Sequence, residues 1–170
     1  MNDAPQKLPL GVQSFREVIE DNCAYVDKTP LALELVRRGK GYFLSRPRRF
    51  GKSLFVNTLK ELFEGNEPLF RGLWIHDKWD WERRYPVIVL DLAAGLADPA
   101  LFDQTLREHL EANQERLGVS CKAQTLAGCF TELIRHAHAQ YGERVVVLVD
   151  EYDKPILDAL EDPAQAAKVR

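Results

Sequence analysis

The chain has 170 residues, of which 45% are hydrophobic and 29% charged, and its formal net charge is -3. These values are typical of a globular protein with its own core, and they exclude a chain that binds nucleic acid through overall positive charge. No apolar run approaches the roughly 18 residues that cross a membrane, and the N-terminus lacks a signal-peptide pattern, so we expect a cytoplasmic protein without a membrane partner. Three widely spaced cysteines form no C-x-x-C pair and are expected to be reduced thiols.

Residues 1–10 are expected to be loose, and helix-like and strand-like stretches alternate after them. Ser14 to Ile19 is a short helix candidate, and Pro30 starts a second helix that Gly39 and Gly41 stop. The apolar run GYFLS (41–45) predicts a short strand, and a helix follows over 52–63 with Gly65 at its C-terminal cap. Residues 66–86 are irregular, and their three tryptophans are expected to cover an edge of the core.

The second half of the chain predicts two strands separated by helices. The run PVIVLDL (86–92) is typical of a strand buried on both faces, and RVVVLVDEYDKP (144–155) is the strongest strand in the chain. Two amphipathic helices lie between them, one carrying Phe102 to Leu117 and the other Leu126 to Ala137. This order predicts an α/β fold with a mostly parallel sheet, in which ligands bind at the carboxyl ends of the strands.

The stretch FLSRPRRFGKSLF (43–55) has the ending of a phosphate-binding loop. Gly51, Lys52 and Ser53 spell GK[ST], but Arg46 stands where the usual pattern has its first glycine. A predicted strand precedes the loop and a helix follows, which is the context that a phosphate loop requires. Lys52 would reach the outer phosphates, and the Ser53 hydroxyl would hold Mg²⁺.

Arg46 alters the entry into this loop. Pro47 fixes its own backbone and biases Arg46 toward an extended conformation, so the loop is expected to enter by another path and close the same way at Gly51. Arg46, Arg48 and Arg49 add positive charge that suits phosphate oxygens. The alternative interpretation is a solvated basic loop or a nucleic-acid patch.

A second motif follows the last predicted strand. Val145 to Val149 lead directly into Asp150 and Glu151. An aspartate at such a strand end holds Mg²⁺ directly or through water, and a glutamate after it orients or deprotonates the attacking water. An Asp-Glu pair alone is more often just the polar end of a strand, but together with the GKS motif it supports a site for ATP hydrolysis.

Other candidates are weaker. Asp91 ends the strand 86–92 and is either near the magnesium or simply a polar strand end. His136 and His138 lie two apart on a helix and therefore on different faces, which disfavours a metal pair. Asp27 or Thr29 is expected to cap the helix that follows.

The segments YVDKT (25–29), RPRRFGKS (46–53) and DEYDKP (150–155) together resemble the AAA-ATPase-like domain family of bacterial P-loop ATPases. The resemblance implies a P-loop NTPase-type three-layer sandwich over residues 11–170, with ATP and Mg²⁺ bound. It implies that Lys52 binds the β- and γ-phosphates and acts in catalysis, that Ser53 and Asp150 bind Mg²⁺, and that Glu151 polarises the attacking water. The implied nucleotide-binding residues are Arg46, Pro47, Arg48, Arg49, Phe50, Gly51, Lys52, Ser53 and Leu54. It also places Tyr25 to Lys28 in the nucleotide-binding module without assigning their role.

Members of this family normally continue past DEYDKP, with further core strands and often a nuclease-like domain. We therefore expect a sheet that is incomplete at the C-terminus, with an open position between the two motif-bearing strands. The strands would pair directly, a protein partner or a second copy of the chain would fill the position, or the chain is a fragment of a longer protein. Two alternative functions stay open, a nucleotide-binding or interaction module without hydrolysis and a nucleic-acid-binding module that uses the RPRR loop.

Overall fold

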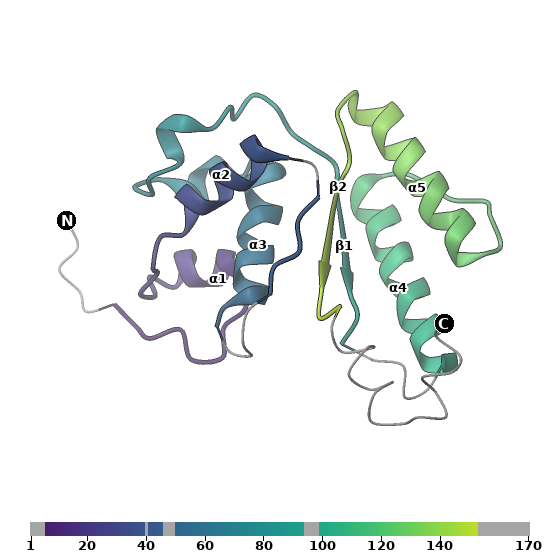
Figure 1. Cartoon of the computed structure of the whole chain (residues 1–170), viewed down its shortest axis with the longest axis horizontal. Helices are drawn as coiled ribbons and strands as arrows, with labels where there is room; N and C mark the ends of the chain where they lie inside the picture. The colour runs from purple at the N-terminus through teal and green to yellow at the C-terminus, as the bar shows by residue number, and fades with distance from the viewer. Residues whose placement is uncertain (1–5, 40, 46–49, 94–98, 153–170) are drawn as a thin grey trace. The chain divides into compact units, whose positions relative to one another are not determined.

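The computed structural model describes residues 6–39, 41–45, 50–93 and 99–152 (Figure 1). The chain divides into two compact units, Met1–Arg84 and Tyr85–Arg170. Among the described helices, none is both long and apolar enough to cross a lipid bilayer.

The first unit is built from helices. They are α1 (Phe15–Glu20), α2 (Thr29–Arg38), α3 (Lys52–Phe63) and two short 3₁₀ turns, η1 (Glu67–Phe70) and η2 (His76–Lys78). The three helices predicted in this unit are confirmed. Their ends are set by residues close to them in the sequence. The Ser14 hydroxyl accepts the N–H of Glu17, and Gly65 is left-handed with its N–H donated to the Leu62 carbonyl at 3.2 Å.

A cluster of apolar side chains forms the core of this unit. It contains Phe15, Ala32, Leu33, Phe55, Leu62, Leu69, Phe70 and Ile75. Trp79 and Trp81 pack against the cluster, which confirms the packing role expected for them, whereas Trp74 is 44% exposed. Burial of each large side chain contributes about 1.5–3 kcal/mol, so this cluster holds the three helices together.

Polar contacts fix α3 against α1. The N–H of Phe15 donates to Oδ1 of Asn57 at 2.8 Å. The buried Glu61 carboxylate accepts from the Arg16 guanidinium at 2.8 Å and from the Asn66 amide at 2.7 Å. A buried carboxylate needs such partners, and these bonds set the position of the helix whose first turn carries Lys52 and Ser53.

The strand predicted at 41–45 is wrong. The structure assigns no strand to these residues, and the side chains of Tyr42 and Phe43 are 52% and 73% exposed. An apolar run becomes a strand only when a neighbouring strand supplies backbone hydrogen bonds. In the described part of the chain, both strands of the sheet come from the second unit.

The second unit has a mixed α/β structure. Its elements are β1 (Val87–Asp91), α4 (Pro99–Leu117), α5 (Leu126–Tyr141) and β2 (Val146–Asp150). The two strands pair in parallel, with Val87 opposite Val146 and Asp91 opposite Asp150. This confirms the α/β class and the parallel pairing, and the three-layer sandwich stays a prediction.

The second strand ends at its two carboxylates, as the sequence predicts. Strand β2 ends at Asp150, because Glu151 has a φ of 52° and leaves the extended region of the backbone. Residues 153–155 of the segment 144–155 lie outside the described residues.

Helix α4 packs along β1 and against α5, and the three elements share a core that includes Ile88, Leu110 and Leu133 (Figure 1). The buried Asn113 of α4 also closes one edge of the sheet. Its Oδ1 accepts the Val89 N–H at 3.0 Å, and its Nδ2 donates to the Val89 carbonyl at 2.8 Å. The Arg116 guanidinium donates to the Val87 carbonyl. The outer edge of β1 is therefore already hydrogen-bonded.

Candidate functional site

The glycine, lysine and serine of the GKS motif form the start of α3. Gly51 caps the helix with φ 72° and ψ 33°, a left-handed conformation that favours glycine, and Lys52 and Ser53 follow in the first turn. No side chain caps this helix end. The first N–H groups of a helix and its dipole attract anions, so this turn suits a phosphate group.

The residues beside this turn differ in their surroundings. Phe50 is 62% exposed, and Leu54 is half-buried against the core of the first unit. Arg46, Pro47, Arg48 and Arg49 lie outside the described residues.

The segment Tyr25 to Lys28 packs against α1 and α3. The ring of Tyr25 meets that of Phe15 edge-on, with centroids 5.2 Å apart. Burial raises the pKa of Tyr25, while hydrogen bonds with the Thr58 side chain and the Lys28 backbone oppose part of that rise. Tyr25 thus holds this segment against the second turn of α3.

Asp27 fixes the same segment to α2 and to residue 74. Its Oδ1 accepts the N–H of Thr29 at 2.8 Å and the Thr29 hydroxyl at 2.6 Å. Its Oδ2 accepts the N–H of Trp74 at 2.7 Å. The expectation that Asp27 or Thr29 caps the following helix is wrong, because Lys28 is the N-cap residue and no side chain makes a cap bond there. Asp27, one residue earlier, accepts the N–H of the first helical residue instead.

Lys28 reaches the start of α3. Its Nζ lies 3.4 Å from the point that a Cβ on Gly51 would occupy. Both residues line a cavity of about 160 Å³, together with Tyr25, Leu54, Phe55 and Thr58. Sequence reasoning assigned no role to Lys28, because a contact between residues 23 positions apart leaves no local pattern.

The second motif lies at the end of β2. The N–H of Glu151 donates to Oδ1 of Asp150 at 2.9 Å, and Glu151 is one of two non-glycine residues with positive φ among the described residues. Strained backbone of this kind is concentrated at functional sites. Asp91 is the register partner of Asp150, and its Oδ1 accepts the Ala93 N–H at 2.9 Å. Asp91 therefore closes the turn after β1, which is the role expected of a polar strand end.

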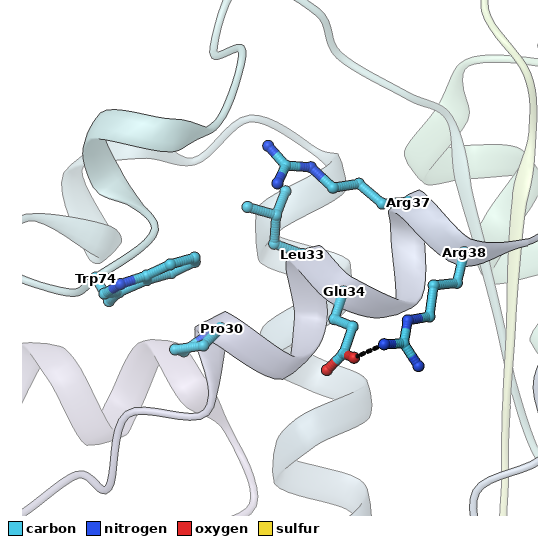
Figure 2. Close-up of a pocket in the computed structure, with 6 residues that line it drawn as sticks. All are labelled: Pro30, Leu33, Glu34, Arg37, Arg38 and Trp74. Atoms are coloured by element: carbon cyan, nitrogen blue, oxygen red, sulfur yellow. Dashed lines mark ion pairs between the residues drawn. The ribbon is translucent and has the colours of Figure 1, made fainter.

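A second hollow of about 220 Å³ lies on α2 (Figure 2). Pro30, Leu33 and the ring of Trp74 give it apolar walls, and Arg37 extends over Leu33. Glu34 and Arg38 form an ion pair of 2.6 Å at its side. It contains none of the GKS or Asp150–Glu151 residues, so we do not assign it to their chemistry.

The histidines and cysteines form no metal centre in the part of the chain that the structure describes. Nδ1 of His136 is bonded to the Ser120 carbonyl, and Nδ1 of His138 to that of Glu143. The three cysteines are unpaired, and burial with the neighbouring Cys129 side chain raises the pKa of Cys121 to about 12. A reactive thiolate is not expected there.

The residues at the start of α3 fit a nucleotide phosphate chain with Mg²⁺. Lys28 and Lys52 carry positive charge, and Ser53 supplies a hydroxyl oxygen. Mg²⁺ keeps several waters and needs only one or two protein oxygens beside those of the phosphates, so a cage built wholly from protein side chains is not required.

Comparison with known proteins gives one family and one relative. Residues 9–170 match the family described as "Predicted AAA-ATPase". The chain is 54% identical over 167 residues to an uncharacterized protein in the vnfD 5′ region of Azotobacter chroococcum mcd 1, covering 97% of this chain and 32% of that protein. The chain thus spans about a third of the length of this relative. No solved structure gives a significant match.

Proposed function

The chain belongs to the family of predicted AAA-ATPases, and we propose that it binds ATP at the start of α3 and hydrolyses it with Mg²⁺. The observation that carries this proposal is the convergence of three features on one helical turn. They are the left-handed Gly51, the first-turn pair Lys52 and Ser53, and the ammonium of Lys28 beside Gly51. Each of them favours a polyanion, and the family to which the chain belongs implies ATP.

In this proposal the loop residues hold the phosphates. Lys52 binds the β- and γ-phosphates, and backbone N–H groups at Gly51 and after it donate to phosphate oxygens. The arginines at 46, 48 and 49 add charge to the same loop. Ser53 and Asp150 hold Mg²⁺, which neutralises the charge that develops on the phosphates when it is bound.

Glu151 is proposed to orient and deprotonate the attacking water. The positive φ at Glu151 supports this role, because strained backbone of this kind is concentrated at functional sites. The bond from the Glu151 N–H fixes the carboxylate of Asp150 against the backbone of Glu151.

Thermal unfolding and phosphate release test the proposal together. We expect ATP to raise the melting temperature of the wild type only with Mg²⁺, and Lys52→Ala to abolish that rise. Glu151→Gln should keep the rise and lose phosphate release by at least about a hundredfold, a typical loss for a general base. An unchanged melting temperature at millimolar Mg-ATP would refute the proposal.

The same experiment separates the alternatives. A rise in melting temperature without phosphate release in the wild type would indicate a nucleotide-binding module without hydrolysis. DNA binding that falls steeply with salt, and that ATP displaces, would indicate a nucleic-acid module that uses the basic loop.

We also propose that a further strand, from a partner or a second copy, pairs with β2. Asn113 and Arg116 already bond to backbone groups on the outer edge of β1 in the described residues, which favours the edge of β2 for a further strand. In the described residues the sheet ends at β2 on that side. Hydrogen exchange at Val147 and Val149 should slow when the partner is present, and unchanged exchange would refute this pairing.

A further inference from the structure

We propose that Lys28 is a second phosphate-binding lysine of the same site, supplied by the segment before α2. This inference rests on the proposed function and assigns a role that the GKS and Asp-Glu motifs do not contain. The observation behind it is the position of the Lys28 ammonium, 3.4 Å from where a Cβ on Gly51 would lie. A group at that position adjoins the first turn of α3 and the cavity of about 160 Å³ beside it.

The nearest carboxylate in the sequence, that of Asp27, forms no ion pair with Lys28 in the described part of the chain. Both oxygens of Asp27 already accept hydrogen bonds, from Thr29 on one side and from the N–H of Trp74 on the other. Within the described part of the chain, no ion pair is found for the Lys28 ammonium. Its charge is therefore available to a ligand.

The position of Lys28 is unfavourable in the absence of an anion. The N-terminus of a helix carries about half a positive charge, so a cation beside it is repelled rather than attracted. Lys52, in the first turn of the same helix, adds a second positive charge. An anion between these groups attracts each of them and so offsets their mutual repulsion, and a phosphate chain supplies such an anion.

The segment around Lys28 is held firmly in place. Tyr25 is fixed against Phe15 and Thr58, and Asp27 is fixed to α2 and to the backbone of Trp74. A side chain on a rigid support loses less conformational entropy when it binds a ligand. Asp27 and Tyr25 are therefore positioning residues for Lys28 rather than phosphate contacts.

The test compares Lys28→Met with the wild type in calorimetric titrations with Mg-ATP, and in thermal unfolding without nucleotide. Loss of one charge-assisted hydrogen bond should weaken ATP binding about ten- to a hundredfold. Without nucleotide the variant should melt at the same temperature as the wild type or higher, because it loses only a repulsive charge. Lys78→Met is the matched control, since Lys78 is an exposed lysine of the same unit that stacks on Trp74, and its ATP affinity should be unchanged.

The outcomes distinguish this inference from the function on which it rests. If Lys28→Met binds ATP like the wild type while Lys52→Ala does not, the role of Lys28 is refuted and the proposed function stands. If Lys28→Met melts at a lower temperature without nucleotide, Lys28 serves the fold and the inference is also refuted. If the wild type itself does not bind Mg-ATP, the proposed function fails.

Discussion

Two residues with left-handed backbone mark the two motifs. Gly51 has φ 72° and Glu151 has φ 52°. Glycine reaches this region without strain, whereas a residue with a Cβ pays about 1–2 kcal/mol. The cost at Glu151 is consistent with a side chain retained for its carboxylate rather than for its backbone preference.

This strain predicts an inverted order of stability at position 151. Elsewhere alanine is usually more stabilising than glycine, but here we expect Glu151→Gly to be more stable than Glu151→Ala by about 1 kcal/mol. Urea denaturation of both variants measures the difference. Both variants lack the carboxylate, so the effect of removing its charge cancels in the comparison. An alanine variant as stable as the glycine variant would mean that position 151 carries no strain.

Among the helices, α5 shows how one side chain orders the segment before it. The Glu132 carboxylate of α5 accepts the N–H groups of Lys122 at 2.7 Å and of Ala123 at 3.1 Å. Thr125 caps the same helix by accepting the Gly128 N–H. These bonds hold the connection from α4 to α5 in place.

These bonds predict a dependence of stability on pH. The two backbone N–H groups, more than any other cause, hold the pKa of Glu132 below its usual value. The stabilisation is therefore present above the unfolded pKa of about 4.5 and is lost as the pH falls through the lower, folded value. Glu132→Gln should show a smaller fall in melting temperature than the wild type between pH 5 and about pH 3. Equal slopes for the two proteins would contradict this role of Glu132.

At the scale of the whole molecule, the sequence predicts the elements that depend on residues close to one another in the chain. The bounds of α3, the cap at Gly65 and the apolar strands β1 and β2 follow from end signals and apolar patterns in short windows. The parallel direction of the sheet follows from the alternation of strands and helices. The strand at 41–45 could not be predicted in the same way, because strand formation depends on a neighbour that the window does not contain.

The candidate site shows the same division. The GKS motif predicts the turn at Gly51 to Ser53, and α3 begins at Lys52, as the motif requires. The approach of Lys28 to Gly51 and the bonds of Asp27 to Thr29 and Trp74 depend on tertiary packing of the first unit. The end of β2 at Asp150 was predicted, but the positive φ of Glu151 was not, because glutamate in itself does not favour that angle.

Hydrogen exchange of the whole chain, with and without Mg-ATP, tests the central claim most directly, because it reports where the nucleotide binds as well as whether it does. We expect protection of the backbone N–H groups over residues 50–55 and 24–29, and no such protection in Lys52→Ala. ATP binding that protects other segments, or no protection in the wild type at millimolar Mg-ATP, would contradict a nucleotide site at the start of α3.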